Sequence, residues 1–85
     1  MYIPDWQHTE NRKKAKRLRE EGFEFEVNAE KFSVKFKGQG LGGAVVRRFT
    51  SEPVNKWQRI ATIRNHLATA IVLANRHKAD SPAPS

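Results

Sequence analysis

The feature that most constrains the fold is a strict alternation of apolar and polar residues between positions 23 and 37. The apolar positions are Phe23, Phe25, Val27, Phe32, Val34 and Phe36. Because side chains of a β-strand point alternately to its two faces, the two halves of this segment are predicted to be strands with one apolar face each. A turn over residues 28–31 joins them. The hairpin then pairs Val27 with Phe32, Phe25 with Val34, Phe23 with Phe36 and, on the polar face, Glu24 with Lys35.

Helices are predicted on both sides of the hairpin. Residues 9–21 are good helix formers, with Asp5 or Thr9 as the N-cap, and Gly22 suits the left-handed conformation that ends a helix. Only Ala15 and Leu18 form an apolar stripe there, so most of this helix is expected to face solvent or a partner. Residues 53–77 repeat apolar side chains every three or four positions from Trp57 to Ala74, which predicts a long helix covering the sheet.

The remaining segments complete the prediction. Residues 38–43, rich in glycine, are predicted to be a loop, and residues 44–49 a third strand. Ser51 is expected to cap the long helix, with Pro53 in its first turn. The apolar side chains of residues 1–8, Tyr2, Ile3 and Trp6, are expected to pack back on the domain. The predicted fold is a small single α+β domain over residues 1–77, helix–three-stranded antiparallel sheet–long helix, followed by a disordered tail at 78–85.

One residue of the long helix is out of place in its pattern. Arg64 falls inside the apolar arc, about 40° from Ile60 at 100° per residue. An arginine at such a position has to extend its charged end to solvent or pair with an acid.

Composition limits the class of protein. The chain has 85 residues, no cysteine and a formal net charge of +7. The missing cysteine excludes disulfides, thiolate metal sites and thiol catalysis. No apolar run approaches the ~20 residues of a membrane span, and the first residues lack a signal-peptide pattern, so we expect a cytoplasmic protein without membrane contact. Small, basic, cysteine-free α+β chains are typical of phage and other mobile elements.

The charge is concentrated in the first predicted helix. Six cations lie within residues 12–19, namely Arg12, Lys13, Lys14, Lys16, Arg17 and Arg19. Glu20 and Glu21 follow Lys16 and Arg17 at i,i+4 spacing and are expected to pair with them. The cluster is either a solubilising surface or a helix that contacts the phosphates of DNA or RNA. In the second case Lys35, Lys37, Arg47 and Arg48 form a possible second rim, and sequence selectivity is weak because no side chain is placed to read base edges.

A protein-binding module explains the same charge. Such a chain, for example a small phage-type inhibitor or adaptor, grips an acidic protein surface. It also uses apolar side chains outside the predicted core, which are Leu41, Val72 and Leu73. A homodimer is another use of the strip that contains Val72 and Leu73.

The sequence contains no residue pattern typical of catalysis or of cofactor binding. The glycines of residues 38–43 lack the following helix that a dinucleotide-binding loop needs. His8, His66 and His77 have no metal-ligand spacing, and Ser33 and Ser51 form no nucleophile set with them. We therefore expect no cofactor, no metal and no enzyme activity. The polar face of the hairpin has no aromatic side chain, which disfavours single-strand binding there.

The predicted order helix–three strands–helix resembles that of double-stranded-RNA-binding domains. The resemblance implies that RNA shape is read by the first helix, by a loop between strands and by basic residues that open the second helix. The chain departs from this pattern because its long helix opens with Pro-Val-Asn-Lys-Trp-Gln-Arg over residues 53–59, and its main basic cluster lies on the first helix.

Overall fold

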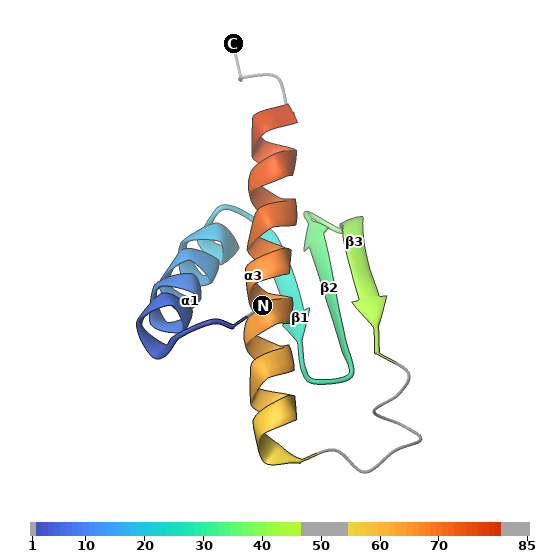
Figure 1. Ribbon diagram of the computed structural model, residues 1–85. Coiled ribbons are helices and arrows are strands. Elements are labelled where there is room, and N and C mark those ends of the chain that lie inside the picture. The colour runs from blue at the N-terminus through green and yellow to red at the C-terminus, as the bar shows by residue number, and fades with distance from the viewer. Residues whose placement is uncertain (1, 47–54, 81–85) are drawn as a thin grey trace.

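The computed structural model describes residues 2–46 and 55–80, which form a small single α+β domain (Figure 1). Helix α1 (Asp5–Glu20) comes first. Strands β1 (Phe23–Val27), β2 (Lys31–Phe36) and β3 (Gln39–Val45) follow, and helix α3 (Lys56–Asp80) comes last. The sheet is antiparallel with the order β1-β2-β3. The predicted order of helix, three-stranded antiparallel sheet and long helix is confirmed.

The predicted hairpin register is confirmed pair by pair. Val27 lies opposite Phe32, Phe25 opposite Val34, and Glu24 opposite Lys35. The turn is closed by the Asn28 side chain, whose Oδ1 accepts hydrogen bonds of 2.9 Å from the backbone N–H groups of residues 30 and 31. Asparagine favours turns because its short side chain can satisfy nearby backbone donors in this way.

The glycine-rich segment is a strand, which corrects the prediction of a loop at 38–43. Lys37 and Gly38 have φ values of 48° and 88°, and positive φ at both central residues is the requirement of a type I′ hairpin turn. The chain therefore reverses within two residues and pairs with β2 from Gln39 onward. The predicted third strand at 44–49 shares only Ala44 and Val45 with β3, and its last three residues lie outside the described part.

Both helices begin at other residues than predicted. Helix α1 starts at Asp5, with Pro4 in extended conformation at the N-cap, and neither Asp5 nor Thr9 caps it through a side chain. It ends at Glu20, and Gly22 follows with φ 114°, as predicted.

Helix α3 starts after Asn55, since Asn55 Oδ1 accepts from the Gln58 N–H at 2.9 Å and Gln58 Oε1 accepts from the Asn55 N–H at 3.1 Å. This reciprocal capping box fixes the start three residues beyond the predicted one. Ser51 and Pro53 lie outside the described residues. The helix continues to Asp80, so residues 78–80, expected in the tail, are helical, and residues 81–85 lie outside the described part.

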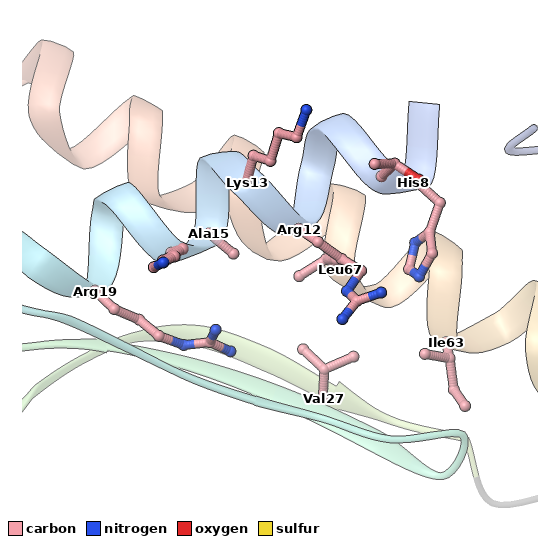
Figure 2. A pocket seen from close by; sticks show the side chains of 10 residues that line it. His8, Arg12, Lys13, Ala15, Arg19, Val27, Ile63 and Leu67 are labelled. Carbon is pink, nitrogen blue, oxygen red and sulfur yellow. The ribbon is translucent and has the colours of Figure 1, made fainter. Parts of the chain in front are cut away.

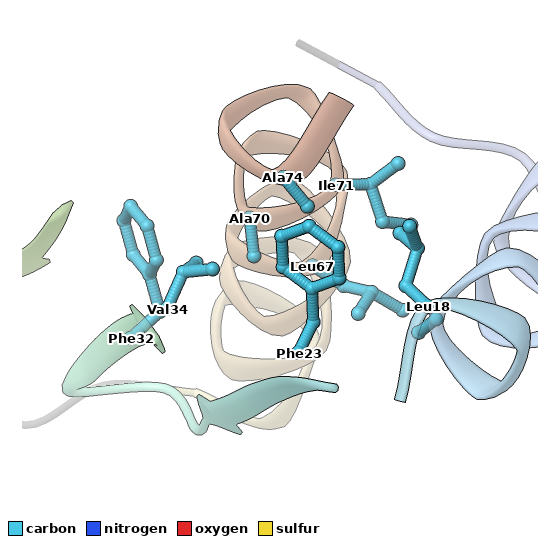
Figure 3. Packing of buried hydrophobic residues seen from close by; sticks show 9 residues of the cluster. Leu18, Phe23, Phe32, Val34, Leu67, Ala70, Ile71 and Ala74 are labelled. Atoms are coloured by element: carbon cyan, nitrogen blue, oxygen red, sulfur yellow. The ribbon is translucent and has the colours of Figure 1, made fainter. Parts of the chain in front are cut away.

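The core lies between the sheet and the two helices (Figure 3). Its buried members are Ala15, Leu18, Phe23, Phe32, Val34, Leu67, Ala70, Ile71 and Ala74. The 25 residues of α3 span roughly 37 Å, whereas a six-residue strand spans roughly 20 Å, so both ends of the helix extend past the sheet. Trp57 is therefore 75% exposed despite its place in the apolar pattern.

The N-terminal segment packs against the domain through one side chain. Ile3 is buried, whereas Tyr2 is 84% and Trp6 70% exposed, which corrects the expectation for these two aromatic residues. Arg64 holds the segment from α3, because its guanidinium donates to the Ile3 carbonyl oxygen at 3.0 Å and lies 2.6 Å from Asp5 Oδ1. Of the two outcomes expected for Arg64, extension of its charged end to solvent or pairing with an acid, the structure shows the pairing.

Candidate binding surface on the first helix

A groove of about 530 Å³ opens between α1, the edge strand β1 and α3 (Figure 2). Its apolar wall consists of Ala15, Val27, Ile63 and Leu67. The polar side chains that line it are His8, Thr9, Arg12, Lys13, Lys16 and Arg19. The lining contains four cations and no carboxylate. Sequence reasoning missed this groove because no local pattern shows how far a helix stands from a strand edge.

The cations of α1 stand along the mouth of the groove. The guanidinium groups of Arg12 and Arg19 reach from α1 toward the sheet, while Lys13 points away from it (Figure 2). Arg12, Lys16 and Arg19 follow one another at i,i+4 and i,i+3 spacing and share one side of the helix. At a rise of 1.5 Å per residue they cover about 10 Å of the helix axis. Arg19 also lies 5.6 Å from the centre of the Phe25 ring, a cation–π distance.

These cations are almost all without an acidic partner. All six, from Arg12 to Arg19, are exposed. Within residues 2–46 and 55–80, the only ion pair that any of them makes joins Lys13 Nζ to Glu10 Oε1 at 3.5 Å. The expected pairing of Arg17 with Glu21 does not form, because Glu21 binds Lys78 of α3 at 2.9 Å. Lys16 likewise has no acidic partner among the described residues. The surface therefore keeps nearly its full positive charge.

His8 stands at one end of the groove, beside Ile63 (Figure 2). Burial is the main cause that lowers the pKa of His8 below 6.5, the charges of Arg64 and Arg12 lower it further, and Asp5 opposes them. His8 is therefore neutral at pH 7. Its buried Nδ1 has no hydrogen-bond partner in the described part of the molecule.

The other two cations of α1, Lys14 and Arg17, face α3 and lie beside a smaller hollow of about 250 Å³. Lys14 and Arg17 line it together with Leu18, Glu21, Asn75 and Lys78. Helix α1 thus presents two basic sides. One faces the edge of β1, and the other faces the C-terminal half of α3.

Two members of the predicted second rim, Lys35 and Lys37, lie within the described residues, and their surroundings differ. Lys35 belongs to the opposite face of the sheet, where it lines a shallow hollow with Glu24, Glu26 and Ser33. Lys37 lies in the β2–β3 turn, where its backbone N–H donates to the Gly22 carbonyl oxygen at 3.1 Å and its Nζ lies 5.3 Å from the centre of the Phe36 ring. Arg47 and Arg48 lie outside the described residues.

The three apolar residues of the predicted protein-binding strip have different environments. Leu41 and Leu73 are partly buried and pack against the core, whereas Val72 is 54% exposed. Leu73 covers Gly42 of β3, and a Cβ added to that glycine would lie 3.1 Å from Leu73 Cδ1. Two of the three side chains therefore contribute to packing inside the domain.

The other two histidines, His66 and His77, make contacts within the domain. His66 is buried on α3, and its Nδ1 lies 2.8 Å from the Asn28 carbonyl oxygen, which accepts the hydrogen bond. His77 packs beside the rings of Phe23 and Phe36. No group of three side chains suited to holding a metal ion occurs within the described ranges. None of the helices in these ranges is long and apolar enough to cross a membrane.

Comparison with known proteins identifies no relative. No family model, no curated protein and no solved structure matches the chain.

Proposed function

We propose that this chain is a small nucleic-acid-binding accessory or regulatory protein, not an enzyme, and that α1 contacts the phosphates. The observation that carries the proposal is the row of exposed cations on α1, of which only Lys13 has an acidic partner among the described residues. Unpaired cations release the counterions of a nucleic acid when they neutralise its phosphates, and this release drives binding.

The proposed binding has weak sequence selectivity. Arginine and lysine side chains that contact phosphates position a protein on the nucleic acid without reading its bases. The exposed residues of α1 other than the cations are Asp5, Trp6, Thr9, Glu10 and Glu20. This set lacks the asparagine or glutamine that pairs with adenine, which leaves the helix few means of discriminating base edges.

Fluorescence anisotropy tests the proposal with duplex DNA, single-stranded DNA and duplex RNA at two salt concentrations. The variant Arg12→Gln/Lys13→Gln/Lys14→Gln is expected to bind all sequences more weakly. Each lost phosphate contact is expected to reduce the slope of log affinity against log salt by about one.

A matched variant separates a local contact from net charge. The variant Lys56→Gln/Arg59→Gln/Arg76→Gln also removes three positive charges, but from exposed positions of α3. It is expected to keep most of the affinity and of the salt dependence. Equal losses in the two variants, or no binding of the unaltered chain even at low salt, would show that α1 is not a phosphate-binding helix.

A further inference from the structure

Strand β1 forms one edge of the sheet, and that edge is open at the groove. The sheet order places β1 outside β2, and no element in the described part of the chain pairs with its outer side. The Asn28 N–H donates to the Lys31 carbonyl oxygen, and the Lys37 N–H donates to the Gly22 carbonyl oxygen. Hydrogen-bonded and non-hydrogen-bonded pairs alternate along an antiparallel ladder. The backbone groups of Phe23, Phe25 and Val27 therefore point away from β2, to the outer side of the sheet. Phe23 is buried, so the accessible part of this edge lies at Phe25 and Val27.

The open edge and the basic row face the same space. Val27 and Arg12 lie between Arg19 at one end of the groove and His8 and Ile63 at the other (Figure 2). The Arg19 guanidinium also lies 5.6 Å from the centre of the Phe25 ring. A chain placed along β1 would have α1 above it, and its helix-side residues would meet the apolar wall formed by Ala15 and Leu67. Three kinds of recognition group therefore meet here, namely unpaired backbone groups, an aliphatic wall and cations.

This combination suits an extended peptide better than a nucleobase. Bases bind proteins by stacking on aromatic rings, and the wall of this groove is aliphatic. A nucleic acid has no backbone that continues a β-ladder, whereas strand addition is a common mode of peptide recognition. The cations and the absence of carboxylates call for acidic side chains on the peptide.

We infer that the groove between α1 and β1 binds an extended acidic segment of a partner protein, which adds to β1 as a fourth strand. An aliphatic side chain of the segment enters the wall between Val27 and Leu67. Carboxylates two residues before and after it lie on the same face of the added strand, about 13 Å apart. Long arginine side chains at positions 12 and 19 can reach both. This inference does not rest on the proposed nucleic-acid binding, although both ligands would contact Arg12 and Arg19.

A second copy of this chain is a poorer occupant than such a segment. If β1 of two copies paired, both α1 helices would lie over the same junction, and their unpaired cations would repel one another. The glutamates of β1 would not relieve this repulsion, because Glu24 and Glu26 lie on the opposite face of the sheet.

A capped, labelled peptide of sequence Thr-Glu-Thr-Leu-Thr-Glu-Thr provides the probe, and anisotropy measures its binding to the full chain. The variant Arg12→Gln/Arg19→Gln is expected to weaken the affinity by at least about tenfold, since two charge-assisted contacts are lost. The matched variant Lys14→Gln/Arg17→Gln removes the same charge from the other side of α1 and is expected to bind as the unaltered chain does. Nucleic-acid binding, in contrast, is expected to weaken in both variants.

Amide hydrogen exchange tests the strand addition itself. The peptide is expected to slow exchange at Phe25 and Val27 by at least about tenfold, because their N–H groups gain partners, while Glu24 and Glu26 already bond to β2. A peptide with leucine replaced by threonine is expected to bind more weakly, and so is one N-methylated at alternate residues.

Several results would overturn the inference. No binding at peptide concentrations up to about 1 mM would do so. Equal losses of peptide affinity in Arg12→Gln/Arg19→Gln and Lys14→Gln/Arg17→Gln would also overturn it. The same holds for peptide binding that does not slow amide exchange at β1. Exchange at β1 that slows with protein concentration alone would assign the edge to a second copy. If a single-stranded oligonucleotide slowed amide exchange at β1 and the peptide did not, the groove would be assigned to nucleic acid.

Discussion

Arg64 of α3 and Asp5 of α1 lie 2.6 Å apart between guanidinium nitrogen and carboxylate oxygen, and they join the first turn of α1 to α3. The two partners differ in environment, because the Arg64 side chain is 22% exposed and that of Asp5 is 89% exposed. Arg64 also donates to the Ile3 carbonyl oxygen. Arg64 therefore organises this corner of the molecule, and Asp5 supplements it from solvent.

This asymmetry predicts unequal effects of mutation on stability. Arg64→Met keeps the aliphatic stem but leaves the Ile3 carbonyl without its donor, and we expect a loss of about 1–2 kcal/mol in the free energy of unfolding. Asp5→Asn is expected to cost less than about 0.5 kcal/mol, because solvent screens an exposed ion pair. Urea denaturation of both variants measures the difference. Equal losses would contradict the assignment of the main role to Arg64.

His8 is predicted to make folding depend on pH. Its folded-state pKa is lowered by burial, Arg64 and Arg12 against the opposing charge of Asp5, so the unfolded chain takes up a proton more readily. The free energy of unfolding should therefore fall as the pH drops below 6.5, and level off once the pH is below the folded-state pKa. His8→Gln is expected to flatten this part of the stability profile. An unchanged profile would contradict the role of His8.

The same histidine reports on its neighbours. Arg64→Met removes a positive charge that lowers the pKa of His8, so that pKa is expected to rise, whereas Asp5→Asn is expected to lower it further. An NMR titration of the His8 ring protons measures both shifts. An unchanged pKa in both variants would show that burial alone sets it, and shifts of the same sign would contradict the opposed effects of Arg64 and Asp5.

Two glycines of β3 are predicted to respond differently to alanine. A Cβ at Gly43 would collide with the Phe32 backbone carbonyl across the ladder, and backbone cannot yield as a side chain does. Gly43→Ala is expected to destabilise the fold by about 1–3 kcal/mol. A Cβ at Gly40 meets no atom within 4 Å, so Gly40→Ala is expected to change stability by less than about 0.5 kcal/mol. Thermal unfolding of both variants checks the contrast, and equal melting temperatures would contradict it.

The capping box of α3 carries a separate prediction. Asn55→Ala removes the Oδ1 that accepts from the Gln58 N–H, and a lost N-cap costs about 1 kcal/mol. Asn55→Ser restores an acceptor and is expected to recover most of the loss. Chemical denaturation measures both, and an alanine variant as stable as the unaltered chain would show that the cap is unimportant.

The sequence by itself determined the elements whose pattern is local. Period-two alternation defined the β1–β2 hairpin, and a slip of one residue would have turned Phe23 and Val34 toward solvent, so the register could be predicted. The place of Arg64 within an apolar arc required its charged end either to reach solvent or to pair with an acid, although the pattern did not decide between the two. The exposed charge of α1 followed from its two-residue apolar stripe.

Only the tertiary structure decided the features that depend on contacts between distant segments. The glycines of β3 carry no alternating pattern, and they form a strand because β2 offers an open edge and the Lys37–Gly38 turn brings them to it. Trp57 is exposed because α3 is longer than the sheet it covers. Glu21 binds Lys78 because α3 passes beside the end of α1, which leaves Arg17 without its expected partner. The groove exists only because α1 and β1 are held apart by the core between them, a distance that no local sequence pattern encodes.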